Sequence, residues 1–353
     1  MKIKLYSYAK INLALNIGNV MADGMHPADT IMQQLALHDE IEVETIEDGR
    51  GDIIITSNKE QVPLDATNLA YRGALLIRDT FSEDRPSEES PGILTEEQRH
   101  HTIKIHIQKN IPIAAGLAGG SGNGAAVMHA LNVLWDLDLS LEELCHLGKS
   151  LGADVPFCIA GQAAVNENLP DKIKESPLAS FAARGRGVGA DLSPCRGFTG
   201  YVVLAKPDMG VSTKEVYQGY DSCVVTERPD VDALEEDLRR GAAELTQAPA
   251  LALEAPVALT QAATAPEAPA ALAYRAAASN MINTLECYTL NAKEEVRILK
   301  SKMEELSPSA IKVLMSGSGP TVFALFLDKE KARDCHEAIR ALGYESYLTE
   351  SRG

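Results

Sequence analysis

A glycine-rich stretch is the feature that most constrains this chain. Residues 110–124 read NIPIAAGLAGGSGNG, between an alternating apolar run at 102–108 and a helically spaced apolar pattern at 125–135. This order predicts a strand, a glycine loop and a helix. Glycines allow the backbone to approach a ligand closely, and the first turn of a helix offers unpaired N–H groups at the positive end of its dipole. The stretch therefore predicts a phosphate-binding loop, with an ordinary turn as the alternative.

The loop differs from two common nucleotide-binding motifs. Ser121 follows Gly120 with no lysine between them, whereas a Walker P-loop carries a lysine there that reaches the β- and γ-phosphates. The glycine spacing is also not the G-x-G-x-x-G of dinucleotide-binding proteins. The loop by itself thus indicates a phosphate without identifying it.

Composition limits the class of protein. The chain has 353 residues, 45% of them apolar, and a formal net charge of −17. This length suits two domains, and the charge disfavours nucleic acid or an anionic membrane as the main partner. No apolar run is long enough to span a bilayer, and the first 17 residues lack the apolar core of a signal peptide. The six cysteines are scattered without a C-x-x-C pair, so we expect a cytoplasmic protein without a disulfide framework.

The hydrophobic periodicity and the positions of Gly and Pro predict a mixed set of helices and strands. Two N-terminal strands, 2–8 and 11–17, could form a hairpin or one continuous ribbon. The polar stretch 82–99 is expected to be a loop, and the Ala- and Pro-rich stretch 245–278 a low-complexity insertion without chemistry. Ser140 and Glu143 form a plausible capping box. The other expected strands are 37–46, 52–56, 157–165, 198–205, 310–315, 321–327 and 344–348, and the other expected helices are 68–81, 139–152, 211–220, 229–241, 280–306 and 329–342.

Several polar residues stand in apolar surroundings, and each has two interpretations. Lys10 and Asn12 fit an edge strand with solvated tips, which the pattern favours, or a buried cation aimed at an anion. Asp154 is either a turn residue, again favoured, or a catalytic carboxylate. Residues 184–189, RGRGVG, are an exposed turn or a source of positive charge near a phosphate. His26 alone is a weak signal.

A second glycine loop lies near the C-terminus. It comprises Ser316, Gly317, Ser318 and Gly319, within a strand–loop–strand–helix–strand order that suggests a small α+β layer. We expect it to face the first loop across a cleft.

These stretches together resemble the GHMP kinases. Residues 112–126 resemble the central glycine motif of that family, residues 10–13 its N-terminal motif, and residues 315–326 its C-terminal motif. YAKINLALNI, ADGMH, LSLEEL, LGADVPF, VSTKEVY and MSGSGPTVFALF resemble the members whose acceptor is CDP-methylerythritol. The resemblance spans residues 10–326, and LGADVPF after LSLEEL is its most specific part.

The resemblance implies an α+β fold of two domains. Residues 1–195 would form an N-terminal, ATP-binding domain that is like a ribosomal-protein domain, with an unusual left-handed βαβ crossover. Residues 196–353 would form a ferredoxin-like domain with an insertion near 245–278. Substrate would lie between the two domains.

The resemblance also implies a reaction and its participants. The γ-phosphate of ATP would pass to the 2-hydroxyl of 4-CDP-2-C-methyl-D-erythritol, a step of the non-mevalonate route to isoprenoids. ATP and Mg²⁺ would be the cofactors, with small molecules as the partners and a monomer or homodimer as the assembly. No metal ligand is assigned, although Ser121 is a candidate.

Each site residue receives a role from the family motif that it matches. Asp154 would accept the hydroxyl proton, and Lys10 would neutralise the transferring phosphoryl group. Asn12 would orient the acceptor hydroxyls, while His26, with Met25 and Tyr217 beside it, would bind the cytosine. The triphosphate would lie on the first loop, formed by Pro112, Ile113, Ala114, Ala115, Gly116, Leu117, Ala118, Gly119, Gly120, Ser121, Gly122 and Asn123.

The chain departs from the family pattern at several positions. Met25 replaces a tyrosine, which removes a stacking face, and GRGVGAD stands where the family has Gly-x-Gly-Glu. In the loop, Ala118 replaces a glycine and is strained if the position needs positive φ. Gly122 replaces a serine, whose hydroxyl could have touched phosphate or Mg²⁺. Two further replacements in the loop are Ala114 and Gly124.

These departures leave two alternatives open. One is a GHMP kinase that acts on a different small alcohol, which Met25 and the altered 184–189 segment suggest. The other is a nucleotide-binding protein of this fold that does not catalyse, which Ala118 and Gly122 suggest.

Overall fold

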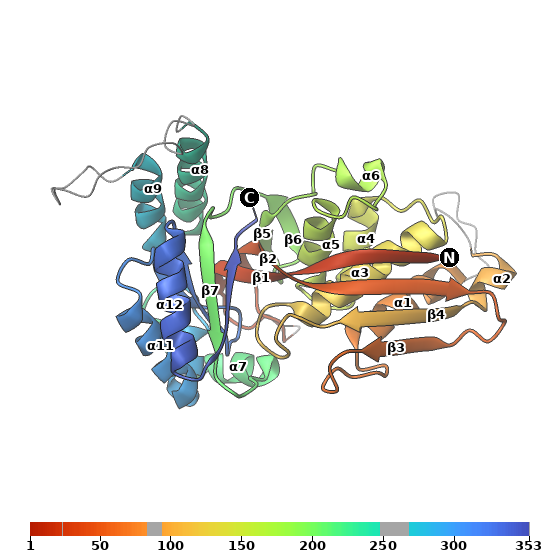
Figure 1. The fold of residues 1–353 in the computed structure, drawn as a ribbon, viewed down its shortest axis with the longest axis horizontal. Coiled ribbons are helices and arrows are strands. Elements are labelled where there is room, and N and C mark those ends of the chain that lie inside the picture. The colour runs from red at the N-terminus through yellow and green to blue at the C-terminus, as the bar shows by residue number, and fades with distance from the viewer. Residues whose placement is uncertain (23, 83–93, 248–267, 353) are drawn as a thin grey trace.

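The computed structural model describes residues 1–22, 24–82, 94–247 and 268–352. Two mostly antiparallel sheets follow one another along the long axis of the molecule, and helices cover each of them (Figure 1). The strands are β1 (Lys2–Ile17), β2 (Ala28–Ile46), β3 (Ile53–Ser57), β4 (Thr102–Gln108), β5 (Ala182–Arg186), β6 (Asp191–Pro194), β7 (Tyr201–Lys206), β8 (Lys312–Met315), β9 (Val322–Phe326) and β10 (Glu345–Glu350). The helices are α1 (Leu69–Ser82), α2 (Glu96–Arg99), α3 (Gly119–Leu134), α4 (Leu141–Gly148), α5 (Val155–Ala163), α6 (Asp171–Lys174), α7 (Thr213–Tyr220), α8 (Val231–Gln247), α9 (Pro269–Ala278), α10 (Glu286–Ala292), α11 (Glu294–Leu306) and α12 (Lys329–Ala341).

The first sheet is built around the long strand β2. Its strand order is β3-β4-β2-β5-β6, and β1 pairs antiparallel with β2 along nearly its whole length. The neighbouring strands β3 and β4 are parallel and are joined through α1. Helices α3, α4 and α5 lie over one face of this sheet (Figure 1), and their apolar residues fill one core with β2 and β4.

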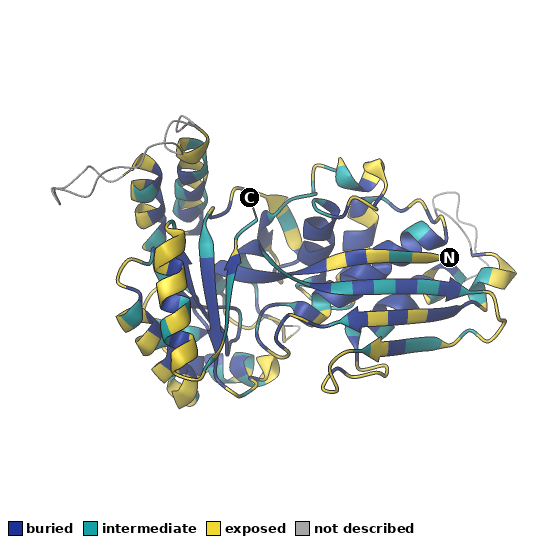
Figure 2. Ribbon diagram, viewed as in Figure 1, coloured by how far each residue is buried: buried dark blue, intermediate teal, exposed yellow. Residues whose placement is uncertain are grey.

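The second sheet has the strand order β10-β7-β9-β8, with every pair antiparallel. Strand β9 is buried throughout, whereas the outer faces of α11 and α12 are exposed (Figure 2). This is the order of a ferredoxin-like sheet, so the expected α+β class is confirmed.

The N-terminal segment is one continuous strand rather than a hairpin. Its register against β2 shifts between Tyr8 and Lys10 and again between Asn12 and Ala14. Such bulges increase the local twist and re-aim side chains. Lys10 and Asn12 are 3% and 2% exposed, so the expectation of solvated tips on an edge strand is wrong.

The strand expected at 157–165 is a helix. All nine residues of α5 are buried, and a short run that is apolar on every side cannot be assigned to a strand or a helix by its period. Pro156 stands in the first turn of α5, where a proline costs no backbone hydrogen bond.

Two segments expected to be irregular are partly helical. Residues 96–99 form α2, capped by Thr95 and Gln98, and residues 269–278 form α9, which packs on α8. Tyr274 of α9 is fully buried with its ring 4.9 Å from that of Phe198. The rest of both expected loops, 83–93 and 248–267, lies outside the described residues. The expected helix 280–306 is divided at Lys293 into α10 and α11.

Residues 186–188 of the segment 184–189 are exposed as expected, whereas Arg184 is buried in β5. It is 5% exposed and pairs with three carboxylates, those of Asp29, Asp232 and Glu235. These hydrogen bonds, Asp29 foremost, raise its pKa. Its charge therefore ties β5 and β2 to α8.

Candidate active site

The first glycine loop begins where β4 ends and leads directly into α3. Helix α3 starts at Gly119, six residues earlier than the sequence pattern suggested, so four of the five glycines in residues 110–124 belong to its first turns. The N–H groups of its first turn have no helical acceptor and carry the positive end of the helix dipole. The loop is fixed to β1 by the Lys10 N–H, which donates to the Leu117 carbonyl at 3.1 Å.

The second glycine loop packs directly against the first. Ser316 Oγ donates to the Gly116 carbonyl at 3.0 Å. Gly116 has φ +72°, and a Cβ there would lie 2.4 Å from the Ser316 carbonyl oxygen, so only glycine fits. The two loops therefore touch, and the cleft expected between them is absent at this point.

A cavity of about 510 Å³ opens beside both loops, a size typical of small-molecule sites. The candidate residues that line it are Lys10, Asn12, Pro112, Ile113, Ala114, Ala115, Gly116, Leu117, Ala118, Gly119, Gly120, Ser121, Asn123, Asp154, Tyr217, Gly317 and Ser318. Gly122, Met25, His26, Ser316 and Gly319 do not line it.

A chain of polar contacts lies on one wall of this cavity. Lys10 Nζ is 3.2 Å from Asp154 Oδ1 and donates to Asn12 Oδ1 at 2.7 Å. Asn12 Nδ2 in turn donates to Thr30 Oγ1 at 2.9 Å, and Thr30 donates to the Ala14 carbonyl. Lys10 and Asp154, 144 positions apart in the sequence, thus meet at one point with their orientation fixed.

Local structure explains how both charged groups reach the cavity. The bulges of β1 flank Lys10 and Asn12, whose side chains point to the same side because they are two residues apart. Asp154 is the residue before α5, but its side chain makes no capping hydrogen bond. Its side chain is 39% exposed, so the carboxylate is available to a ligand, and turn chemistry does not explain this residue.

Tyr217 and His26 lie next to this chain of contacts. Their rings are 5.5 Å apart in an edge arrangement. Burial, and then the charge of Asp154, raise the pKa of Tyr217 to about 12, so its hydroxyl stays protonated at neutral pH. His26 Nδ1 is 3.0 Å from the Gly18 carbonyl and Nε2 is 3.3 Å from Asp221 Oδ1. Met25 is half exposed beside it.

Gly122 does not line the cavity, although it belongs to the predicted phosphate loop. Its N–H donates to the Ala118 carbonyl at 2.8 Å, inside the helix. A Cβ at this position would lie 2.4 Å from Ser7 Oγ and so would point into β1 rather than into the cavity. The serine hydroxyl that the family carries here would therefore have met Ser7 and not a phosphate.

A Gly122→Ser variant is expected to lose about 1–3 kcal/mol of unfolding free energy, because the added side chain overpacks against Ser7. Urea unfolding measures this loss. The double variant with Ser7→Ala should recover most of it, because the contacting oxygen is gone. Gly120→Ser is a control for stability, since a Cβ at Gly120 has no neighbour nearer than 3.8 Å. An equal loss in both single variants would contradict the packing argument.

Two alanines of the loop have left-handed backbone. Ala118, the residue before α3, has φ +55°, and Ala114 has φ +52°. The sequence argument identified Ala118 as a strained residue if it needed positive φ, and it does. Strain of this kind persists where the surrounding structure over-determines the backbone.

An Ala118→Gly variant is expected to gain about 0.5–1 kcal/mol of unfolding free energy. Removing left-handed strain contributes about 1–2 kcal/mol, and the greater freedom of glycine in the unfolded chain offsets part of it. Ala115→Gly is the matched control, because Ala115 is buried and has no positive φ. It should lose stability in the same urea titration, and a gain there would refute the strain explanation.

Thr213 and Thr30 are among the residues that line the cavity and escaped the sequence argument. Thr213 stands at the start of α7, and its hydroxyl oxygen is 3.0 Å from the hydroxyl oxygen of Ser318. Thr30 supports Asn12. Neither stands in a pattern that singles it out, although VSTKEVY contains Thr213.

Within the described ranges, no group of three or more His, Cys, Asp or Glu side chains could hold a metal ion. Mg²⁺ usually keeps waters and takes only one or two protein oxygens beside substrate phosphates. The Ser121 hydroxyl and the Asp154 carboxylate both line the cavity, and this pair of oxygens fits such a requirement. No helix of the part described is long and apolar enough to cross a membrane.

The glycine loop, the Lys10–Asp154 pair and the two sheets define a class of protein. The sequence model for the GHMP kinases N terminal domain matches residues 68–162, and the model for GHMP kinases C terminal matches residues 258–345. The chain belongs to the GHMP kinases and is a small-molecule kinase.

Two relatives that are about a third identical to this chain carry the same name. The 4-diphosphocytidyl-2-C-methyl-D-erythritol kinase of Clostridium acetobutylicum is 34% identical, covering 92% of this chain and 91% of its own length. That of Clostridium beijerinckii is also 34% identical and covers 98% and 99%. A crystal structure of 4-(cytidine 5'-diphospho)-2C-methyl-D-erythritol kinase superposes with a TM-score of 0.66 at 25% identity, covering 99% of this chain and 100% of that one.

Proposed function

We propose that this chain transfers the γ-phosphate of ATP to the 2-hydroxyl of 4-CDP-2-C-methyl-D-erythritol. The observation that carries the proposal is the Lys10–Asp154 pair, 3.2 Å apart beside a glycine loop at a helix N-terminus. The names of the relatives supply the acceptor. Such a kinase acts in the non-mevalonate route to isoprenoids.

The side chains have distinct roles in this proposal. Asp154 accepts the proton of the acceptor hydroxyl, since it is the exposed carboxylate next to the loop. Lys10, held by Asn12, keeps a positive charge where the phosphoryl group transfers. The first-turn N–H groups of α3 bind the phosphates. His26 and Tyr217 form a partly aromatic wall for the cytosine.

Mg²⁺ would be held by the phosphates with Ser121, and it would neutralise the charge of the triphosphate. We also infer two domains, 1–195 and 196–353. The first sheet ends at Pro194 and the second begins at Tyr201, which supports this boundary.

The test is ADP release by the purified chain with ATP, Mg²⁺ and each of several alcohols. CDP-methylerythritol should be the best acceptor by kcat/KM, and phosphorus NMR of the product should show a new monoester on C2. Homoserine and mevalonate serve as comparison acceptors. Turnover of another alcohol with CDP-methylerythritol inert would favour the kinase of different specificity, and ATP binding without any turnover would favour the non-catalytic protein.

A further inference from the structure

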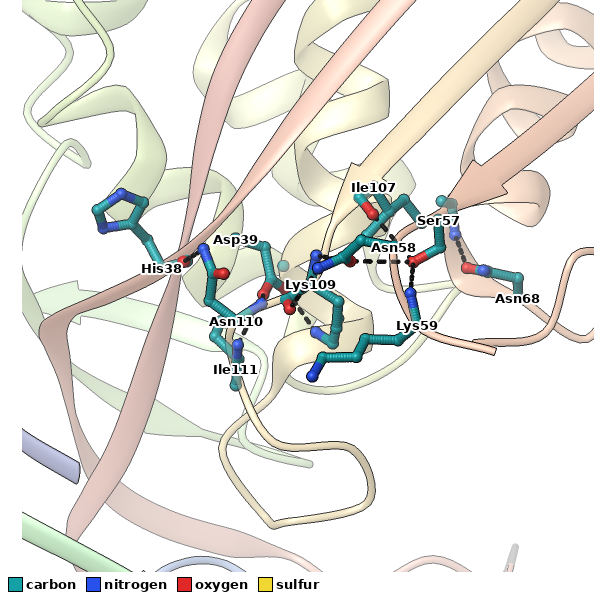
Figure 3. Close-up of polar contacts among 12 residues, drawn as sticks. His38, Asp39, Ser57, Asn58, Lys59, Asn68, Ile107, Lys109, Asn110 and Ile111 are labelled. Carbon is teal, nitrogen blue, oxygen red and sulfur yellow. Dashed lines mark hydrogen bonds and ion pairs between the residues drawn. The ribbon is translucent and has the colours of Figure 1, made fainter. Parts of the chain in front are cut away.

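A buried carboxylate outside the cavity ties the glycine loop together. Asp39 has no exposed surface. It lies in β2 one residue before Glu40, which pairs with Gln108 at the end of the β2–β4 ladder. Asp39 Oδ1 accepts the N–H groups of Asn110 and Ile111 at 2.7 and 2.8 Å (Figure 3). The carboxylate thus replaces the strand partner that these two residues lose as they leave the sheet.

The other oxygen of Asp39 holds the far end of the loop. Asp39 Oδ2 accepts from Lys109 Nζ, whose ammonium lies under α3, 2.6 Å from where a Cβ of Gly119 would stand. When the side-chain amide of Asn123 is oriented so that its oxygen and its nitrogen both have suitable hydrogen-bond partners, its nitrogen also donates to Asp39 Oδ2, at 2.9 Å. One carboxylate therefore contacts the residues that enter the loop and a residue of the helix that leaves it.

We propose that Asp39 is a positioning residue that sets the separation of the two ends of the phosphate loop. The loop between them has no regular structure and contains the left-handed Ala114 and Ala118. A strained segment keeps its shape only where its ends are fixed. Asp39 does not line the cavity, whereas Lys109 and Asn123 do, so it acts on the phosphates through the backbone and the two side chains that it holds.

This inference depends on the proposed function only in taking ATP as the ligand of the loop. A purely structural role for Asp39 predicts lower stability and unchanged ligand preference. A positioning role predicts a selective loss for ligands that carry phosphates, because only these use the loop. Adenosine has no phosphate, so it reports on the rest of the nucleotide site.

The experiment compares ATP and adenosine binding by calorimetry in the full chain and in Asp39→Asn. The amide oxygen can still accept from the backbone N–H groups or from the Lys109 ammonium, but the neutral amide has one acceptor oxygen where the carboxylate has two charged ones. The Kd for ATP should rise at least about tenfold, since charge-assisted hydrogen bonds that shape the loop are lost. The Kd for adenosine should change less than about twofold. Leu144→Ala, a fully buried core change in α4, is the matched destabilised control and should leave the ATP-to-adenosine ratio unchanged.

Asn123→Ala provides the second variant in case Asp39→Asn does not fold, because it opens the helix end of the contact, together with the Asn123 hydrogen bonds to Ser7 and Gly119. It should show the same phosphate-selective loss, smaller in size. An equal loss for both ligands, or no loss in a folded variant, overturns the proposal. Failure of the unsubstituted chain to bind ATP would instead reject the proposed function.

Discussion

Replacing Lys10 by methionine is expected to lower kcat by about 100- to 1,000-fold, while the Kd for ATP changes little. Lys10 is 3% exposed, and its ammonium lies 3.2 Å from Asp154, at the cavity wall beside the loop. A charge held in place where negative charge develops typically contributes this much to the rate. Methionine keeps the length of the side chain and removes the charge.

Lys4→Met is the matched control, since Lys4 lies on the same strand and pairs with Glu40 at the surface. It should retain kcat within about twofold, because exposed ion pairs contribute little. Single-turnover rates with saturating ATP and acceptor measure the effect. If Lys10→Met retained more than a tenth of the activity, the assignment of a catalytic charge at this position would be wrong.

Replacing Asp154 by asparagine is the second large change, with an expected fall in kcat of about 100- to 10,000-fold. Asparagine has nearly the same shape but cannot accept the hydroxyl proton. Asp154 makes no capping hydrogen bond to α5, so the helix should keep its stability, and thermal unfolding should be nearly unchanged. The measurements are kcat and the unfolding midpoint of the same preparation.

Asp171→Asn is the control for this change, because Asp171 also stands at the start of a helix but is exposed and remote from the cavity. The double variant Lys10→Met/Asp154→Asn should be no slower than about the slower single variant, since groups that act on one step are not additive. If the fall in kcat of the double variant equalled the product of the two single falls, the two residues would act on separate steps.

The family resemblance predicted the fold class from short motifs, and local pattern predicted many of the elements. The capping box of Ser140 and Glu143 and the helix that follows it are present as expected. The buried helix α5 was mistaken for a strand, because a run that is apolar on all sides has no period to read. Helix α9 was missed because its alanines resemble low complexity, whereas its stability comes from packing Tyr274 against Phe198 and α8.

The candidate site was only partly predictable. Residue chemistry alone favoured a turn for Asp154 and a solvated strand for Lys10, and the resemblance supplied the catalytic interpretation. Asp39 carried no signal at all, since an aspartate in an amphipathic strand is common and its partners lie about 70 positions away.

The sequence by itself determined that a glycine loop joins a strand to a helix, because this depends on local backbone freedom and hydrophobic period. It also determined the family, through motifs in which residue type is tied to chemistry. Only the tertiary structure decided that Lys10 meets Asp154, that Gly122 faces Ser7, and that Asp39 holds both ends of the loop. These three contacts join segments that are far apart in the sequence. The two bulges of β1 and the end of the β2–β4 ladder bring those segments together, and local sequence patterns do not encode such long-range contacts.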